Sequence, residues 1–133
     1  MKHKDHFFKK TMFTSLNQIR LVLFSAILLV VIDFGIDEKE EEACRTFLKT
    51  HWQPGWGDWE TAYQAAFEEV RTFLAHRAEL PQHLPALFGE IKANLDPAQI
   101  QILLDLMGQI AQADNKEMPQ ETNLLSQFRL GLG

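Results

Sequence analysis

The chain is short of cysteine and of positive charge. Cys44 is its only cysteine, which excludes an intramolecular disulfide and a cysteine-based metal cluster. Lysine and arginine number 13 against 18 aspartates and glutamates, so the formal net charge is -5. No basic stripe remains to neutralise phosphates, and we expect no nucleic-acid partner. A lone cysteine agrees with a reducing compartment.

Familiar catalytic motifs are also missing from the sequence. There is no glycine-rich phosphate loop, no HExxH and no nucleophile elbow. The histidines are scattered at spacings that dictate no site: His3, His6, His51, His76 and His83. We therefore expect a protein that is not an enzyme. The alternative is a small metal-dependent enzyme that uses surface carboxylates.

Long hydrophobic runs are rare. The one strongly apolar stretch, 21–32, is bounded by Arg20 and Asp33. It is shorter than the roughly 20 residues that a membrane-spanning helix needs. Because it is apolar almost all round, it is predicted to be a central helix surrounded by others.

The sequence shows no alternating pattern of strand type, whereas helix signals recur along the chain. They predict an all-α, compact bundle of about six helices with short connections. The expected helices run from Thr14 or Ser15 to about Ile32, from the N-cap Asp37, from the N-cap Asp58 to about Arg77, over 84–95, from Asp96-Pro97 to Asp114, and from Pro119 to Gly131 and Gly133.

Residues 1–13 differ from the rest in being basic and aromatic. We divide the chain into this N-terminal arm and a single helical domain, residues 14–133. An alternative function follows from the arm, because basic and phenylalanine-rich segments bind anionic lipid. On that reading the protein is membrane-peripheral, with the bundle facing the cytosol.

One unit of helix, acidic turn and helix occurs twice, at 29–47 and at 110–128. A shift of 81 residues places Asp33 on Asp114, Glu40 on Glu121 and Phe47 on Phe128. The same shift aligns the apolar residues of the preceding helices. The sequence therefore predicts an internal helix-turn-helix pseudo-repeat.

The two acidic turns suggest weak binding of a divalent cation, because Ca²⁺ and Mg²⁺ prefer several oxygen ligands. The interpretation that needs no ligand is that these residues cap helices, which acidic side chains at helix N-termini commonly do. We favour capping and keep the cation site as a hypothesis. The candidate ligands are Asp33, Asp37, Glu40, Asp114, Glu117 and Glu121.

Three tryptophans fall within one loop, residues 51–59, where Pro54, Gly55 and Gly57 oppose a regular helix. We favour a hydrophobic lid over the bundle, since loop aromatics mostly bury against the core. The alternative is a surface that binds an unknown protein partner or a ligand. The residues concerned are Trp52, Trp56 and Trp59.

The repeated unit combines an apolar helix, a step close to Ala-Asp-Gly and a glutamate that opens the next helix. This pattern resembles that of the TerB-like family, named for tellurite resistance. The second copy carries Ala113-Asp114-Asn115 with Glu121, and the first Ile32-Asp33-Phe34-Gly35 with Glu40. Phe34 interrupts the Asp-Gly step, and Asn115 and Lys116 replace the glycine. The middle of the chain matches only in being helical.

The resemblance implies a compact helical bundle with an internal pseudo-repeat. It also implies a bacterial cytoplasmic protein linked to stress or to resistance against metal oxyanions such as tellurite. The family has no well-defined catalytic activity. The combined expectation is a non-enzymatic interaction module, with weak divalent-cation binding at its acidic turns kept as a hypothesis.

Overall fold

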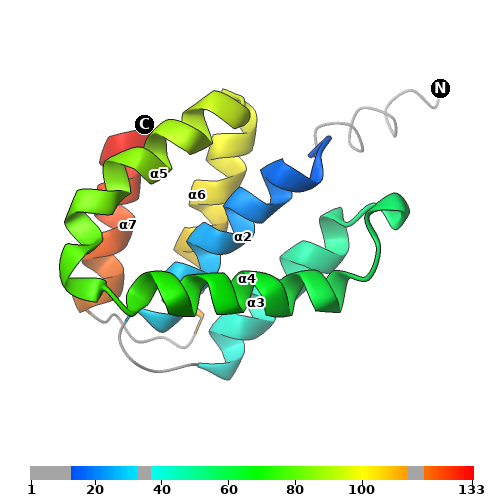
Figure 1. The fold of residues 1–133 in the computed structure, drawn as a ribbon, viewed down its shortest axis with the longest axis horizontal. Coiled ribbons are helices and arrows are strands. Elements are labelled where there is room, and N and C mark those ends of the chain that lie inside the picture. The colour runs from blue at the N-terminus through cyan, green and yellow to red at the C-terminus, as the bar shows by residue number, and fades with distance from the viewer. Residues whose placement is uncertain (1–12, 33–36, 114–118) are drawn as a thin grey trace.

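The structure is a computed structural model that describes residues 13–32, 37–113 and 119–133. These residues form six α-helices and no β-strand, which confirms the predicted all-α bundle (Figure 1). The helices are α2 (Leu16–Val31), α3 (Glu38–His51), α4 (Trp59–Leu74), α5 (Leu80–Asn94), α6 (Pro97–Gln112) and α7 (Pro119–Leu132), with short 3₁₀ helices η1 (Pro54–Trp56) and η2 (Arg77–Glu79).

Helix α2 lies at the centre of the bundle, as its sequence predicts. It contacts each of α3, α4, α5, α6 and α7. Most of its residues are buried, and several lose all exposure to solvent. The only side-chain hydroxyl of α2, Ser25 Oγ, donates to the carbonyl of Leu21 at 2.9 Å, so it adds no unpaired polar group. Among the described residues, no helix is long and apolar enough to cross a membrane.

The pseudo-repeat is visible in the helix bounds. Adding 81 to the ends of α2 gives the ends of α6, and adding 81 to the ends of α3 gives those of α7. The packing is reciprocal as well, because α2 contacts both α3 and α7, and α6 contacts both α7 and α3. The four helices are therefore related by an approximate twofold symmetry.

The first turns of α2 and α6 meet through equivalent glutamines. Gln99 Nε2 donates to Gln18 Oε1 at 3.3 Å, and the two residues are 81 apart. Each glutamine also donates its backbone N–H to the N-cap side chain of its own helix, Ser15 or Asp96. Matching caps thus fix the starts of the two central helices side by side.

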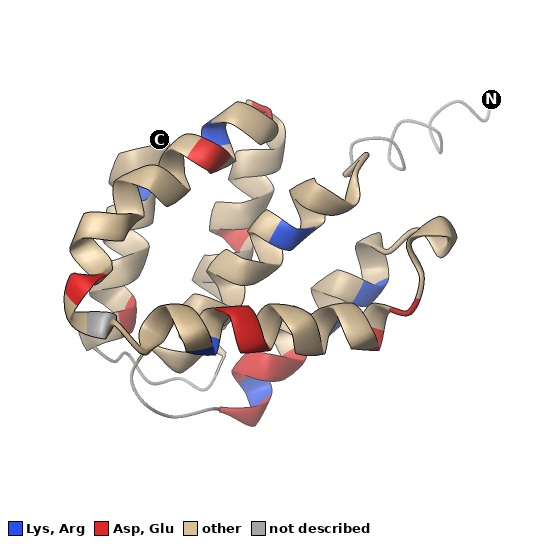
Figure 2. Cartoon of the chain, in the orientation of Figure 1, with Lys and Arg blue, Asp and Glu red and all other residues tan. Residues whose placement is uncertain are grey.

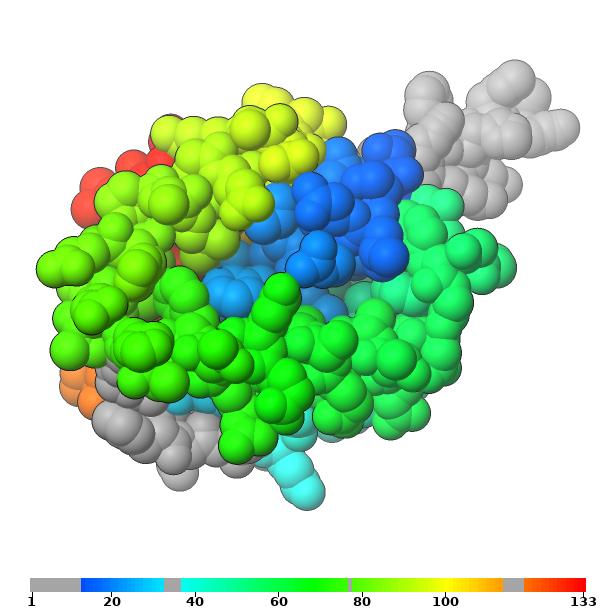
Figure 3. Space-filling model, viewed as in Figure 1, coloured from blue at the N-terminus to red at the C-terminus, as the bar shows by residue number. Residues whose placement is uncertain are grey.

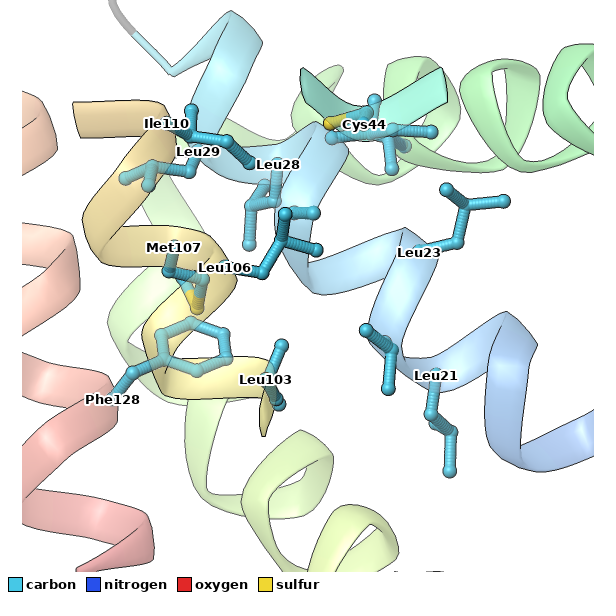
Figure 4. Close-up of a cluster of buried hydrophobic side chains, with 14 of the residues drawn as sticks. Leu21, Leu23, Leu28, Leu29, Cys44, Leu103, Leu106, Met107, Ile110 and Phe128 are labelled. Carbon is cyan, nitrogen blue, oxygen red and sulfur yellow. The ribbon is translucent and has the colours of Figure 1, made fainter. Parts of the chain in front are cut away.

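Side chains from both repeats fill the core (Figure 4). Cys44 of α3 is fully buried and packs as a small core residue. The residues labelled in the figure come from α2, α3, α6 and α7: Leu21, Leu23, Leu28, Leu29, Cys44, Leu103, Leu106, Met107, Ile110 and Phe128.

Several predicted boundaries are wrong. Helix α3 extends through His51 and α4 begins at Trp59, although both residues were assigned to the loop. Helix α4 ends at Leu74 rather than near Arg77, because the chain tightens into η2 there. Helix α5 is longer than predicted, since Pro81 and Pro85 both lie within it. Pro81 lies in the first turn, where backbone N–H groups have no partner within the helix. Pro85 lies inside the helix, where it supplies no N–H for the usual hydrogen bond to the carbonyl four residues earlier.

Gly131 does not end the last helix but lies inside α7. A Cβ atom at this position would overlap the ring of Phe88 in α5. That ring also packs edge-to-face on Phe128, with centroids 5.0 Å apart. The glycine is therefore needed for the close approach of α5 to α7.

We predict that Gly131→Ala destabilises the protein. Helix propensity favours alanine by about 1 kcal/mol, but overpacking against Phe88 costs about 1–3 kcal/mol. We expect a net loss of about 1 kcal/mol in the free energy of unfolding, measured by urea denaturation. Gly89→Ala is the matched control, because its Cβ would meet open space. That variant should gain about 0.5–1 kcal/mol. Equal stability of the two variants would contradict the packing argument.

Candidate functional site

The six acidic residues proposed as cation ligands divide into two groups. Asp33, Asp114 and Glu117 lie outside the described residues. Asp37, Glu40 and Glu121 are described. Within the described part of the chain, no group of three or more His, Cys, Asp or Glu residues is placed to hold a metal ion.

Asp37 acts as a helix cap. Its Oδ1 atom accepts hydrogen bonds from the backbone N–H groups of Lys39, at 2.8 Å, and Glu40, at 3.1 Å. These N–H groups have no partner within the helix, so the aspartate stabilises the start of α3. The favoured capping interpretation therefore describes Asp37.

Glu40 and Glu121 are both buried, with 2% and 1% exposure. They are equivalent in the repeat, and each is the third residue of its helix, α3 or α7. A buried carboxylate is costly unless it is compensated. The positive end of the helix dipole favours negative charge at this position. The two repeats thus place one buried carboxylate each directly after an acidic turn.

A polar cluster joins α3 to α4. The Tyr63 hydroxyl donates to Glu41 Oε2 at 2.9 Å, and the Arg45 guanidinium lies 4.4 Å from the centre of the Tyr63 ring. Burial, the nearby Cys44 and the hydrogen bond to Glu41 raise the pKa of Tyr63. Burial, followed by the charges of Glu41 and Glu40, raises the pKa of the Cys44 thiol. Both groups stay protonated near neutral pH, so neither is an activated nucleophile.

The tryptophan loop is ordered by contacts within itself and with α3. Trp52 Nε1 donates to the Gly57 carbonyl at 2.7 Å, and the rings of Trp52 and Trp56 meet edge-to-face at 5.3 Å. Lys49 Nζ lies 5.3 Å from the centre of the Trp59 ring. Gly57 has a φ of 93°, which glycine adopts easily. All three tryptophans are half-buried against the core, which is the packing expected of a lid.

The sequence indicated no role for His51, but in the structure its ring packs against two phenylalanine rings. Its ring lies 4.4 Å from the Phe47 ring and 5.7 Å from the Phe13 ring, measured between centroids. Its Nδ1 atom is buried, without a hydrogen-bond partner in the described part of the chain. Burial lowers the pKa of His51 below its usual value near 6.5. The four-residue spacing from Phe47 is the sequence signal, once α3 is known to include His51.

Two of the hollows on the surface are lined by described residues. One is a recess of about 300 Å³ over α2, between α4 and α5, which is visible in Figure 3. Arg20 and Glu69 form an ion pair at its rim, with 2.9 Å between Nη2 and Oε2. The other is a groove of about 570 Å³ along α3 and α6. It is lined by Lys39, Glu42, Ala43, Thr46, Phe47, Thr50, His51, Gln109 and Ala113. We call it the α3–α6 groove.

Charge is unevenly distributed over the bundle. Acidic residues crowd the first turns of α3, at the lower edge of Figure 2. The helix dipole stabilises negative charge there. The tryptophan loop follows the other end of the same helix. Helix α3 thus connects an acidic surface, the α3–α6 groove and an aromatic loop.

The fold and these surfaces define a small all-α protein built from two equivalent helix pairs, joined by two linking helices. The family model described as "Tellurite resistance protein TerB" matches residues 21–133. The chain therefore belongs to the TerB family. The match includes the middle of the chain, which the repeated motif alone did not reach. No curated protein and no solved structure gives a significant match.

We predict that His51 makes stability depend on pH. Its pKa is lower in the folded protein than in the unfolded chain. Between these two values the unfolded chain binds more protons, so stability falls as pH falls. The contribution of neutral His51 is complete above about pH 6.5 and is lost below it. His51→Phe keeps an aromatic ring between Phe13 and Phe47 but cannot titrate.

The measurement is urea denaturation of both proteins at pH 7.5, 6.5 and 5.5, values chosen to span about one unit on either side of the usual histidine pKa. The stability of the natural protein relative to His51→Phe should decrease toward pH 5.5. A difference that stays constant over this range would show that His51 does not titrate as described.

Proposed function

We propose that this TerB-family protein is a non-catalytic module that binds a partner protein through its tryptophan loop, in a stress or tellurite response. The observation that carries the proposal is that three half-buried indole rings are held in fixed positions on the surface. The protonated states of Cys44 and Tyr63 support a role without covalent catalysis.

Tryptophan is suited to such a surface. Hot spots of protein interfaces are enriched in tryptophan, tyrosine and arginine. Rings that are already ordered lose little side-chain entropy on binding. Trp52 and Trp56 are fixed by each other and by Gly57, and Lys49 lies over Trp59. The acidic first turns of α3 would favour a partner with basic residues.

A photo-crosslinking amino acid tests the proposal in cells. Trp56 is replaced by p-benzoylphenylalanine, which preserves an aromatic side chain. Exposed Gln64 on α4 carries the same group as the matched control. We expect a specific adduct with one protein from position 56 and none from position 64. Identical adducts from both positions, or none from either, would contradict the tryptophan loop as the binding surface.

A second variant measures the contribution of the loop to affinity. We predict that Trp56→Ala weakens binding of the cross-linked partner by about 30-fold, as expected for an interface hot spot of about 2 kcal/mol. Gln64→Ala should leave the affinity unchanged. Unfolding curves of both variants establish that the domain is intact. Unchanged affinity of an intact Trp56→Ala protein would exclude this residue as a hot spot.

A second candidate function is divalent-cation binding at the acidic turns. It is favoured by the burial of Glu40 and Glu121, one at each turn. The candidate ligands Asp33 and Asp114 belong to the same two turns, so each turn offers several carboxylate oxygens. We propose Ca²⁺ or Mg²⁺, because all the candidate side chains supply oxygen.

An ¹H–¹⁵N NMR titration with Ca²⁺, Mg²⁺ and Zn²⁺ tests this candidate. We expect saturable shifts in the first turns of α3 and α7, with Kd between about 0.1 and 1 mM. Glu40→Gln should weaken the site at α3. Glu38→Gln, an exposed neighbour in the same turn, is the matched control. An absence of saturable shifts would leave these residues as structural groups of the helix starts.

A further inference from the structure

The approximate twofold symmetry relates α2, α3, α6 and α7. It does not extend to the helices that cover these four. Helix α5 lies on α7 and α2. Its Phe88 ring packs on Phe128, at 5.0 Å, and over Gly131. The 81-residue shift relates α7 to α3, and α2 to α6. The surface equivalent to the one under α5 is therefore formed by α3 and α6.

That equivalent surface is the α3–α6 groove. Phe47 and Thr50 line the groove, and they correspond to Phe128 and Gly131. Phe128 is fully buried, whereas Phe47 is only partly buried. The groove thus marks the place where, among the described residues, no helix covers the first repeat as α5 covers the second.

The segment equivalent to α5 is the start of the chain. Subtracting 81 from Asn94, the last residue of α5, gives Phe13, and subtracting 81 from Phe88 gives Phe7. Phe13 is buried, and its ring contacts Phe47 at 5.9 Å and His51 at 5.7 Å. Gln53 Nε2 also donates to the Phe13 carbonyl at 2.8 Å. The described chain therefore begins against two residues that line the groove.

We propose that residues 1–12 of this chain dock in the α3–α6 groove, and that Phe7 packs on Phe47 as Phe88 packs on Phe128. The connection through Phe13 supports this occupant, because a tethered segment has a high effective concentration at the groove. Charge is also complementary. Lys2, Lys4, Lys9 and Lys10 belong to the segment, and the first turns of α3 are acidic.

The docking is weaker than that of α5. The buried α5 residues Leu84, Leu87 and Ile91 correspond to His3, His6 and Lys10, which are polar. The groove is also less apolar than the surface under α5, because Ala43 and His51 stand where α7 has Leu124 and Leu132. A polar segment on this groove buries less hydrophobic area than α5 does, so its docking contributes less to stability.

Paramagnetic relaxation in the full-length protein tests the proposal. Lys4→Cys is labelled with a nitroxide, and Cys44 is protected by its complete burial. We expect line broadening at the amides of Thr46, Thr50 and Gln109 in the groove. Broadening that is absent from these amides would overturn the proposal.

Adjacent phenylalanines provide matched variants. Phe7→Ala should reduce the broadening in the groove at least about threefold, whereas Phe8→Ala should leave most of it, because the symmetry places only Phe7 on Phe47. Equal effects of the two substitutions would overturn this placement. The two variants have the same composition, so their difference reports position and not loss of an aromatic residue.

Other occupants are distinguished by two further samples. A mixture of ¹⁵N-labelled natural protein and unlabelled nitroxide protein reports contacts between copies. Broadening of the groove in that mixture would assign it to a second copy and overturn the proposal.

Vesicles of phosphatidylserine and phosphatidylcholine test lipid binding. If deletion of residues 2–12 abolishes vesicle binding, and the groove shows no broadening without vesicles, the segment is a lipid anchor and the proposal fails.

Discussion

The burial of α2 is the constraint on which the rest of the fold depends. A helix that is apolar on nearly every face must be covered on every face. Five helices are arranged around it, and α6 has a special place among them because it is the repeat equivalent of α2. Each buried leucine or isoleucine of α2 contributes about 1.5–3 kcal/mol, so the positions of the surrounding helices are strongly determined. The glutamines at the helix starts then fix the relative position of α2 and α6.

The second helix of each repeat, α3 or α7, is covered by a different helix and on a different face. Helix α3 is covered by α4, through the contacts of Tyr63 with Glu41 and Arg45. Helix α7 is covered by α5 on another face, where Phe88 meets Phe128. Leu130, the equivalent of Lys49, is 85% exposed because no described helix lies over that face of α7. The linking helices therefore break the symmetry, and the open surfaces of the two repeats differ.

Local chemistry explains which parts of the fold can be predicted from sequence. Helix starts at Ser15, Asp37, Asp58 and Asp96 were predictable, because an N-cap acts on backbone groups two or three residues away. The end of α4 was not, since no glycine marks it and the chain simply tightens into η2. The 81-residue repeat was predictable because both copies keep apolar spacing and an acidic turn.

Features that join distant residues could not be predicted in this way. The need for glycine at position 131 comes from a phenylalanine 43 positions earlier. The surroundings of His51 depend on Phe13 and on the true end of α3. The α3–α6 groove combines residues of two helices that are far apart in the chain. A single sequence contains these residues but not their contacts, because helix packing decides which faces meet.

The same asymmetry explains why the α3–α6 groove lies along α3 and not along its equivalent. In the second repeat, apolar Leu124, Phe128 and Leu132 are buried, so that surface of α7 serves stability. In the first repeat, α4 already anchors α3, so the equivalent surface can carry alanine, threonine and histidine with little loss of core packing. Helix α3 therefore presents this surface in the α3–α6 groove, whereas α7 buries its own against α5.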